Sequence, residues 1–365
     1  MEKFNILVAA GGTGGHLFPA VSVVEELETI LGERFNAVFT GNIHRIEGKK
    51  VPALGYDFHP IPMSGFKSKF SPSNLAIPFR TLKSINICTK IIDDYKIDAV
   101  LCTGAYLSYP AGIAATMKRK PLILMESNVY PGKSIKALSG RSNLIFTAFE
   151  DTLKYLRQGP KTTIINIGNP VRKPLLNLPD KTQAADTFGL TADKKTLLVF
   201  GGSLGARTIN KAVEKFIKAG KTDKLQIIWQ TGNNYTPDLP ELPNVKILPF
   251  IDDMASAYAA ADLVLARAGA TTVAELTVTG KPALLVPYPH SANDHQTYNA
   301  EFFEKNGAGY MIRDNQLWDK IEYIIEELIY SEEKLETMAA AAKKLAKPDA
   351  AANAAKYILK LFAGN

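Results

Sequence analysis

The sequence predicts an α/β protein with two domains, each built on a parallel β-sheet covered by helices. Three observations support this prediction. Short apolar runs alternate with longer helical stretches, a glycine-rich strand-to-helix pattern occurs once in each half, and 365 residues exceed what one ordinary core accommodates. The composition, 46% hydrophobic and 22% charged, is that of an ordinary globular protein, so disorder is not expected to dominate.

The first half of the chain alternates strands with helices. Strands are expected at residues 5–10, 37–40, 99–103, 122–125 and 144–147, with a helix at 18–31 and further helical stretches between the later strands. This order is typical of parallel sheets, whose strands need long crossover connections. The first apolar run is short and leads directly into glycines, which indicates a buried strand and not a secretory signal. No run reaches the length of a membrane-spanning helix.

The pattern begins again near residue 196. Residues 5–16 read NILVAAGGTGGH and residues 196–207 read TLLVFGGSLGAR. In the second half, strands are expected at 226–230, 245–249, 263–266 and 283–286, and helices at 293–306, 316–330 and 349–362. The sequence therefore predicts a first domain of residues 1–168 and a second of residues 169–348. The C-terminal helix, residues 349–365, is a candidate to pack on the first domain.

The net charge of +7 lies in the first half. Residues 1–170 contain 20 Lys and Arg against 13 Asp and Glu, whereas the remaining residues contain 23 of each. A basic half favours an anionic partner, such as a membrane surface, a phosphorylated lipid or a nucleic acid, although solubility alone is an equally good explanation. The two cysteines, Cys88 and Cys102, form no CxxC pair and are interpreted as free thiols.

The two glycine-rich turns indicate anion binding. Glycines let the backbone approach an oxygen-rich ligand, and the unpaired N–H groups at the start of the following helix lie at the positive end of its dipole. Neither turn is a Walker loop, because no GK[ST] follows, and neither fits GxGxxG. Binding of NAD is therefore disfavoured, and a substrate that carries phosphate or diphosphate is expected at the turns of residues 11–15 and 201–205.

His16 directly follows the first turn and is the candidate general base. An imidazole at the carboxyl end of a strand, where α/β sheets bind ligands, can accept a proton from an attacking hydroxyl near neutral pH. A helix cap or a surface histidine is the alternative explanation. No metal site is expected, because the sequence contains no HExxH, no Asp-x-Asp and no Cys/His cluster with ligand spacing. A leaving diphosphate would then depend on backbone N–H groups and a cation.

The segment from residue 250 to residue 300 carries further candidates. Residues 267–270 form a turn of small residues, and a helix is expected over 271–279 with Glu275 in its early turns. A carboxylate there can accept two hydrogen bonds from a ribose diol, although a simple charge at a helix N-terminus is the alternative. Residues 290–296 are polar, follow a strand and can present Gln296 to the hydroxyls of a sugar.

These segments resemble the MurG family, the peptidoglycan N-acetylglucosaminyltransferases. The resemblance covers nearly the whole chain, and its motifs occur in the family's order. They are GGTGGHLFPA at 11–20, TGAYLSYPA at 103–111, ESN at 126–128, GNPVR at 168–172, GGSLGAR at 201–207, FIDDM at 250–254, RAGATTVAE at 267–275 and NDHQTYNA at 293–300. The chain departs from the family at Ala268, where Ser is common, at Ser127, where Gln is common, and at Ala105 and Tyr109, where Gly is common.

The resemblance implies a GT-B glycosyltransferase fold, in which two Rossmann-like domains face a cleft. It implies a hexosyltransferase that moves GlcNAc from UDP-GlcNAc to O4 of the muramyl sugar of lipid I and so forms lipid II for peptidoglycan. Inversion at the anomeric carbon and catalysis without metal or cofactor are part of this expectation. The acceptor is a lipid-linked diphosphate at the inner face of the cytoplasmic membrane. Other enzymes of the cell wall or of division are possible partners, and nucleic acid is not one.

The resemblance also implies roles for individual residues. Thr13, Gly14, Gly15 and Asn128 would line the sugar and acceptor side, with His16 as the candidate base. Arg172 and Ser203 would contact the nucleotide and its phosphates, and Ile251 would meet uracil through its backbone. Ala270, Thr271, Thr272, Val273, Ala274 and Glu275 would surround the diphosphate and ribose, with Glu275 on the ribose diol. Gln296 would hold the GlcNAc hydroxyls.

The segment of residues 66–90 is a candidate membrane surface. It interleaves Phe66, Phe70, Leu75, Ile77, Phe79, Leu82, Ile85 and Ile87 with Lys67, Lys69, Arg80, Lys83 and Lys90. Apolar residues beside cations suit an anionic lipid surface, whereas an apolar helix face packed into the core is the alternative, and a mixed role is expected. Three other functions stay open: a UDP-GlcNAc epimerase, a transferase that acts on another glycolipid, and a non-catalytic nucleotide-sugar-binding module.

Overall fold

The computed structural model describes residues 3–63, 75–202 and 204–363. The chain divides into two compact units. Unit 1 consists of Met1–Val171 and Asp349–Asn365, and unit 2 consists of Arg172–Pro348. The division after Val171 falls close to the predicted boundary at residue 168, and the C-terminal segment belongs to unit 1.

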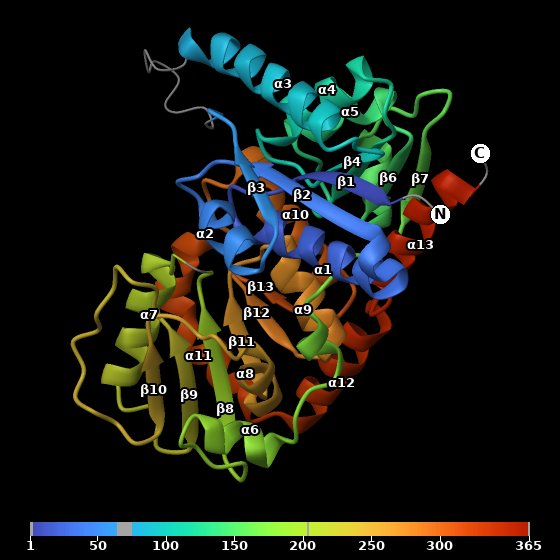
Figure 1. Ribbon diagram of the computed structural model, residues 1–365. Helices are drawn as coiled ribbons and strands as arrows, with labels where there is room; N and C mark the ends of the chain where they lie inside the picture. The colour runs from blue at the N-terminus through green and yellow to red at the C-terminus, as the bar shows by residue number, and fades with distance from the viewer. Residues whose placement is uncertain (1–2, 64–74, 203, 364–365) are drawn as a thin grey trace. The chain divides into compact units, whose positions relative to one another are not determined.

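Unit 1 contains a parallel sheet of seven strands within its described residues, in the order β3-β2-β1-β4-β5-β6-β7 (Figure 1). The strands are β1 (Phe4–Ala9), β2 (Phe35–Gly41), β3 (Asp57–Pro60), β4 (Ala99–Cys102), β5 (Leu122–Glu126), β6 (Leu144–Thr147) and β7 (Thr163–Asn166). Successive residues of β1 alternate between two core layers: Ile6 and Val8 enter one, and Leu7 and Ala9 the other. Both faces of the sheet are therefore covered, as a parallel sheet requires.

The helices of unit 1 lie on both faces of this sheet. They are α1 (Gly14–Leu31), α2 (Ile46–Ala53), α3 (Ile77–Asp94), α4 (Ser108–Met117), α5 (Lys133–Leu138) and α13 (Ala350–Ala363), with short 3₁₀ helices η1 (Gly32–Arg34), η3 (Ser139–Arg141) and η4 (Glu150–Tyr155). Helices α1 and α13 pack together and share one core layer, whereas α3 and α4 pack together on the other. Both ends of the chain are thus built into the same unit.

Unit 2 repeats this architecture with a parallel sheet of six strands among its described residues, in the order β10-β9-β8-β11-β12-β13. The strands are β8 (Lys195–Phe200), β9 (Leu225–Gln230), β10 (Val245–Leu248), β11 (Leu263–Ala266), β12 (Ala283–Leu285) and β13 (Gly309–Met311). This order corresponds strand for strand to the six strands β3-β2-β1-β4-β5-β6 of unit 1. Each sheet places the first strand of its unit at the centre, where the connection reverses direction.

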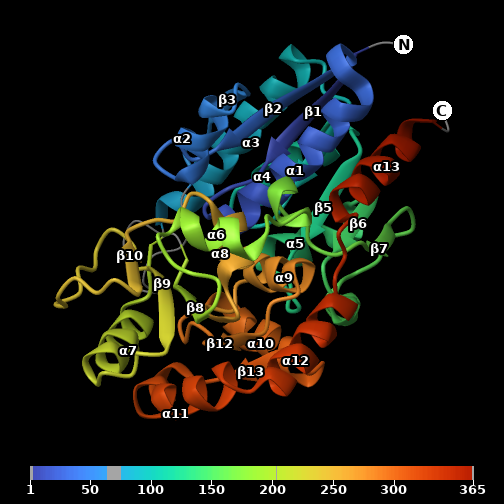
Figure 2. The same cartoon turned by 90° about the horizontal axis from the view of Figure 1, so that it is seen from below.

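The helices of unit 2 follow the strands in the same way. They are α6 (Lys181–Thr187), α7 (Arg207–Lys218), α8 (Met254–Ala260), α9 (Ala270–Thr279), α10 (His295–Lys305), α11 (Leu317–Ile329) and α12 (Glu332–Lys344), with 3₁₀ helices η5 (Lys173–Leu176), η6 (Ala292–Asp294) and η7 (Asp314–Gln316). Helices α7 and α11 pack side by side against the sheet (Figure 2). Their apolar faces and one face of the strands form a continuous core layer.

The predicted repeat has a physical counterpart at the start of each central strand. Asn5 N donates to Asp98 Oδ2 at 2.8 Å, and Asp98 N donates to Asn5 O at 2.8 Å. Thr196 N and Asp262 form the same reciprocal pair, with both distances at 2.8 Å. The prediction of two parallel-sheet α/β domains is therefore confirmed. Most predicted boundaries differ from the structure by one or two residues, and β3, β7 and β13 were not predicted. The largest shift is at α1, which begins at Gly14 and not at residue 18, because Gly14 and Gly15 already have helical backbone.

Candidate functional site

The first glycine-rich turn leads without a break into α1. The N–H groups of His16 and Leu17 both donate to the carbonyl of Thr13 at 3.2 Å, and this bonding fixes the start of the helix. Thr13 is exposed, whereas Gly14, Gly15 and His16 are half-buried. These four predicted residues are consecutive and form the N-cap and first turn of α1, after the carboxyl end of β1. This is the edge of a parallel sheet at which α/β proteins bind ligands.

His16 is oriented by the strand beside it. Its Nδ1 lies 2.8 Å from the carbonyl oxygen of Thr103, and Thr103 Oγ1 donates to the carbonyl of His16 at 2.8 Å. Because a carbonyl oxygen only accepts, Nδ1 carries the proton, and the neutral ring has Nε2 as its basic nitrogen. A Cβ on Gly104 would lie 3.0 Å from His16 Cε1, so glycine makes room for the imidazole.

Asn128 follows β5, at the same edge of the unit 1 sheet. The buried carboxylate of Glu126 accepts from Asn128 N at 2.9 Å, from Asn128 Nδ2 at 3.0 Å and from Gly132 N at 2.8 Å. Burial raises the pKa of Glu126, and these hydrogen bonds act in the opposite direction. The carboxylate therefore holds both the backbone and the amide of Asn128 in place.

The second glycine-rich turn is packed so closely that a side chain at Gly201 or Gly205 would clash with neighbouring atoms. A Cβ on Gly201 would lie 2.3 Å from Ala206 Cβ, and Gly205, at φ +75°, would place one 2.0 Å from the carbonyl oxygen of Thr231. Backbone therefore packs directly on backbone here, which only glycine permits. Ser203, predicted to contact phosphate, lies outside the described residues.

Gln230 connects this turn to the predicted uracil contact. The side chain is buried at the carboxyl end of β9. Its Nε2 donates to the carbonyl of Gly202 at 2.9 Å, and its Oε1 accepts from Ile251 N at 2.8 Å. Two segments that lie about 50 residues apart in the sequence are thus joined through one amide, which uses a donor and an acceptor at once.

The first turns of α9 hold the residues predicted to surround the diphosphate and ribose. They are Ala270, Thr271, Thr272, Val273, Ala274 and Glu275, with Gly269 as the N-cap. The helix therefore begins where the predicted diphosphate site begins, and its dipole favours an anion there. Glu275 lies farther along the helix and is buried.

Glu275 is held on both carboxylate oxygens. Arg172 Nη2 is 3.1 Å from Oε1, and Tyr258 Oη donates to Oε2 at 3.0 Å. Burial raises the pKa of Glu275, while the Arg172 guanidinium and the Tyr258 hydroxyl act in the opposite direction. Two predicted nucleotide residues, separated by 103 positions in the sequence, are thereby brought into direct contact.

Gln296 lies in the first turn of α10, after a strained connection. Asn293 and Asp294 both have left-handed backbone, with φ of +54° and +55°. Gln296 Oε1 accepts from Tyr288 N at 2.9 Å, which orients its amide group. Consecutive residues in this conformation are costly and are typical of loops shaped for binding.

Among the predicted residues, the structure brings Arg172 and Glu275 into direct contact and places both residues 13–16 and Asn128 after the carboxyl ends of strands of one sheet. Sequence reasoning missed Tyr258 and Gln230, which position predicted residues and are themselves buried. The signal for Gln230 was a polar residue that ends the otherwise apolar strand LQIIWQ. Tyr258 carried no comparable signal, because its partner is 17 residues away on another helix.

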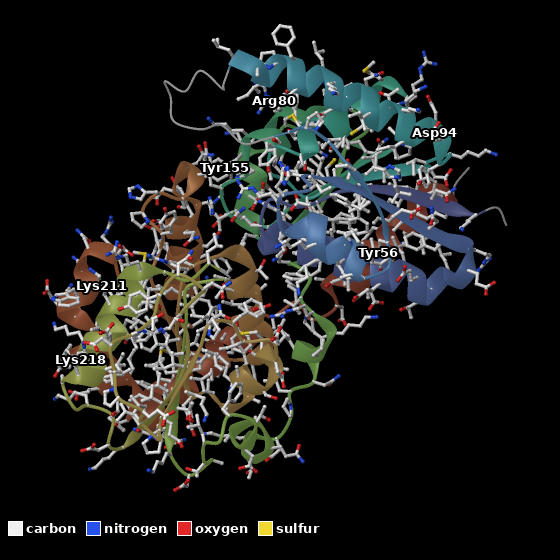
Figure 3. All side chains as sticks on the ribbon, turned by 60° about the vertical axis from the view of Figure 1, so that its left-hand side comes forward. Tyr56, Arg80, Asp94, Tyr155, Lys211 and Lys218 are labelled. Atoms are coloured by element: carbon white, nitrogen blue, oxygen red, sulfur yellow. The ribbon has the colours of Figure 1, made fainter. Side chains whose placement is uncertain are left out.

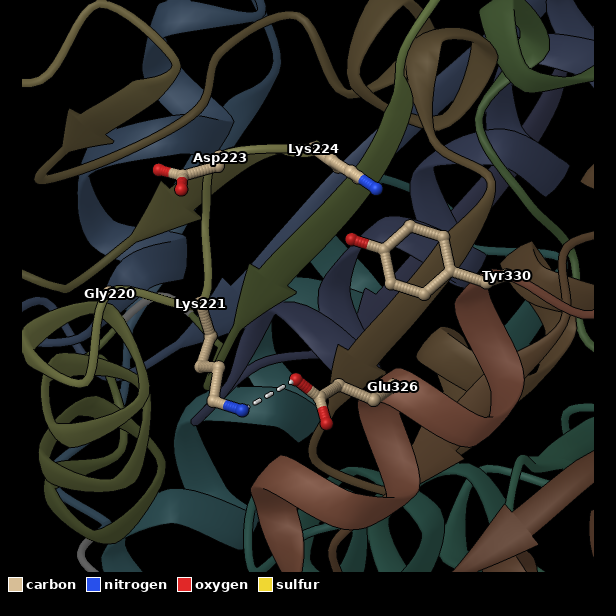
Figure 4. Close-up of a pocket in the computed structure, with 6 residues that line it drawn as sticks. All are labelled: Gly220, Lys221, Asp223, Lys224, Glu326 and Tyr330. Atoms are coloured by element: carbon tan, nitrogen blue, oxygen red, sulfur yellow. Dashed lines mark ion pairs between the residues drawn. The ribbon is translucent and has the colours of Figure 1, made fainter.

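A separate pocket of about 360 Å³ lies elsewhere in unit 2 (Figure 4). Its lining includes Lys221, Glu326 and Tyr330, and Lys221 Nζ pairs with Glu326 Oε1 at 3.2 Å. Lys221 and Lys224 precede β9, so the pocket lies at the amino end of that strand and contains none of the predicted site residues.

Across the described residues, no three His, Cys, Asp or Glu side chains are grouped closely enough to hold a metal ion.

Comparison with known proteins places the chain in a family. The glycosyltransferase family 28 N-terminal domain matches residues 6–147, and the family 28 C-terminal domain matches residues 196–354. The Flavobacterium psychrophilum UDP-N-acetylglucosamine--N-acetylmuramyl-(pentapeptide) pyrophosphoryl-undecaprenol N-acetylglucosamine transferase is 36% identical over 99% of this chain and 98% of its own length. The enzyme of the same name from Chlorobium limicola is 38% identical, over 98% of this chain and 99% of its own.

Solved structures agree with this placement. The crystal structure of Acinetobacter baumannii MurG superposes with a TM-score of 0.75 at 27% identity, and the match covers 98% of this chain and 99% of that one. The S. aureus MnaA–UDP structure, at 18% identity and a TM-score of 0.68 over 99% and 98% of the two chains, shares the fold alone. The chain belongs to glycosyltransferase family 28, has the GT-B fold, and is a member of the MurG family within it.

Proposed function

We propose that this protein transfers GlcNAc from UDP-GlcNAc to O4 of the muramyl sugar of lipid I and so forms lipid II. End-to-end similarity to transferases that carry this activity in their names supports the reaction. The orientation of His16 is the observation within the site that supports it best. The Thr103 carbonyl holds the ring so that Nε2 is basic, as deprotonation of an acceptor hydroxyl requires.

The donor is held by unit 2 in this proposal. The N-terminus of α9 and the guanidinium of Arg172 would stabilise the diphosphate, and Glu275 would accept from the ribose diol. Because Ile251 N–H already donates to Gln230, the carbonyl of Ile251 is the group that would accept from uracil N3–H. Gln296 would bind the GlcNAc hydroxyls, with its amide already oriented by Tyr288 N.

The acceptor is held by unit 1, with Thr13, Gly14, Gly15 and Asn128 on the sugar and acceptor side. His16 Nε2 takes the proton from the muramyl O4 hydroxyl as that oxygen attacks the anomeric carbon of GlcNAc. The new C1–O4 bond forms as the bond from C1 to the diphosphate oxygen breaks, and UDP departs with the bonding electrons. Attack opposite the leaving group inverts the α-linked sugar to a β-linkage, and no metal is required in this scheme.

Helix α3 supports a peripheral membrane attachment. Leu75, just before the helix, and Phe79 and Leu82, in its first turns, expose 80%, 76% and 65% of their surfaces, whereas Cys88 and Ile91, farther along the helix, are buried in the core. Figure 3 labels Arg80, in the first turn of this helix, and Asp94, its last residue. Exposure at the start of the helix and burial farther along it support the predicted mixed role. Phe66, Lys67, Lys69 and Phe70 lie outside the described residues.

We extend the proposal to an anionic cytoplasmic membrane surface, where lipid I would be met. Apolar side chains beside the basic residues Arg80 and Lys83 favour such an interface. Across the parts of the chain that the structure describes, no helix combines the length and apolar character that a membrane crossing needs. Other enzymes of cell-wall synthesis and division are the protein partners that this position would bring near.

A turnover assay with UDP-GlcNAc and a soluble lipid I analogue tests the proposed function. The expected result is a lipid-linked disaccharide that appears with UDP, at the same rate with and without EDTA. UDP or an epimerised sugar without a lipid product would favour hydrolysis or epimerisation. UDP-GlcNAc binding without turnover would favour the non-catalytic module. Transfer only to a different glycolipid would show that lipid I is not the acceptor.

A further inference from the structure

A buried carboxylate lies directly behind the first glycine-rich turn. Glu47, in the first turn of α2, has no exposed surface. Its Oε2 accepts from Gly12 N at 2.8 Å, and its Oε1 accepts from Asn42 N at 2.9 Å. Both oxygens thus bind backbone N–H groups, one in the loop after β1 and one in the loop after β2. Hydrogen bonds to a charged acceptor are about twice as strong as neutral ones.

Two glycines make the space for this carboxylate. A Cβ on Gly11 would lie 2.3 Å from Glu47 Cδ, and a Cβ on Gly41 would lie 2.6 Å from Glu47 Cγ. At Gly41, the three nearest atoms to that added Cβ all belong to Glu47. The side chain of Glu47 is therefore sufficient to explain why both positions are glycine.

In unit 2, the glycine-rich turn is also held by a buried side chain, but there the side chain donates the hydrogen bond and the turn accepts it. There the Gln230 amide donates to the carbonyl of Gly202. In unit 1, Glu47 instead withdraws the N–H of Gly12 from any ligand and places a negative charge behind the turn. The two turns resemble each other in sequence, but Gly12 N–H has a partner within the protein.

We propose that Glu47 is a positioning residue that fixes the turn of residues 11–15, and through it the start of α1 with His16, for the transfer reaction. This inference rests on the proposed function. Only Thr13, Gly14 and Gly15 lie between Gly12 and His16, and this backbone is the turn that the acceptor would meet. Displacement of a reacting group by about 1 Å can cost about 100-fold in rate, so a fixed turn has kinetic value.

The test replaces Glu47 by Gln and measures three quantities. Glutamine has one acceptor oxygen, so its NH₂ must face either Gly12 N–H or Asn42 N–H. The expected result is a fall in kcat of about 10- to 100-fold, an unchanged Kd for UDP, and faster amide hydrogen exchange in the peptide that spans residues 11–16. Asp98→Asn is the matched control, because Asp98 also accepts a backbone N–H from β1 but lies at the amino end of that strand. Its kcat and its loop exchange should equal those of the wild type.

A second variant keeps the charge and moves the carboxylate. Gly41→Ala displaces Glu47 from its slot and should reproduce the kinetic pattern of E47Q. In an E47A background the added methyl has room, so G41A should cause little further loss, and the two changes should be strongly non-additive. Additive losses in this cycle would contradict the steric argument.

The outcomes separate the two claims. Unchanged kcat and unchanged loop exchange in both E47Q and G41A, beside an active wild type, would overturn the role of Glu47. A fall in thermal stability with normal kcat and normal loop exchange would make Glu47 a stability residue and also overturn it. If the wild type forms no lipid-linked disaccharide, the proposed function is refuted. Amide hydrogen exchange of residues 11–16 in E47Q would then still show whether Glu47 fixes the turn.

Discussion

Single residues show how buried polar groups shape the sites of both units. His16, Asn128 and Glu275 are each held by a partner that the solvent does not reach: the Thr103 carbonyl, the Glu126 carboxylate and the Tyr258 hydroxyl. An oriented group loses less entropy when substrate binds and needs less rearrangement during reaction. The predicted residues are therefore oriented by buried neighbours, and one of these, Tyr258, lies outside every motif quoted from the sequence.

Replacement of His16 by Ala should reduce turnover by about 100-fold or more while the Kd for UDP-GlcNAc stays nearly unchanged. The reason is that the base acts in the transition state and contributes little to donor binding. Steady-state kinetics and calorimetric titration measure the two quantities. His59→Ala, on strand β3 of the same unit, is the control. Normal turnover in H16A would remove His16 from the mechanism.

Replacement of Ala105 by Gly should stabilise unit 1 by about 1 kcal/mol. Ala105 has φ +55°, a left-handed conformation in which a Cβ is strained and glycine is not. Urea unfolding measures the difference. Lys96→Gly, at φ +49° and away from the site, should give a similar gain. A loss of stability in A105G would show that the alanine side chain contributes packing that exceeds the strain.

At the scale of elements, helix α3 differs along its length. Its later turns complete the core beside the sheet, and its first turns expose apolar side chains that no described residue covers. Exposed apolar residues beside cations are the expected composition of a surface that lies on anionic lipid.

The double substitution F79E/L82E should reduce binding to vesicles that contain anionic lipid by about 10-fold or more, because it removes apolar insertion and adds repulsion. Vesicle sedimentation measures the bound fraction. Turnover with a soluble lipid I analogue should stay normal. Tyr323→Glu, on helix α11 and 69% exposed, is the matched control and should bind as the wild type does. Equal binding by F79E/L82E would exclude α3 as the membrane surface.

Local patterns predicted the inner strands well because apolar runs and glycine-rich turns act within a few residues of the chain, whereas the edge strands β3, β7 and β13 were not predicted. The central strands, the repeat and the C-terminal helix follow from such runs. The start of α1 was placed four residues late because glycine usually disfavours helix, whereas Gly14 and Gly15 are helical here. Tyr258, Gln230 and Glu47 could not be predicted as partners, since each bond joins segments that only the folded sheet brings together.

At the scale of the whole molecule, the chain uses one architecture twice. The strand orders correspond, and the reciprocal pairs at Asn5 and Thr196 repeat the same contact. The chain leaves unit 1 after Val171 and returns to it at Asp349. Helix α13 then buries Ala354, Ala355 and Ile358 against the core of unit 1. Residues from both ends of the chain therefore stabilise the unit that carries His16.

Replacement of Ile358 by Ala should destabilise unit 1 by about 2–4 kcal/mol, since it removes a fully buried side chain and leaves a cavity beside α1. Urea unfolding, followed by hydrogen exchange in β1 and α1, measures the effect. Lys356→Ala, on the exposed face of the same helix, should change stability by less than about 0.5 kcal/mol. A small effect of I358A would mean that unit 1 is stable without α13.

The most direct test of the central claim is the identity and linkage of the product formed from UDP-GlcNAc and a lipid I analogue. The account predicts one lipid-linked disaccharide for each UDP released, with a β-linkage at the transferred GlcNAc by NMR and no dependence on added metal. Release of UDP or free sugar without a lipid-linked disaccharide would contradict the proposed transfer, and an α-linked product would contradict the inverting attack promoted by His16.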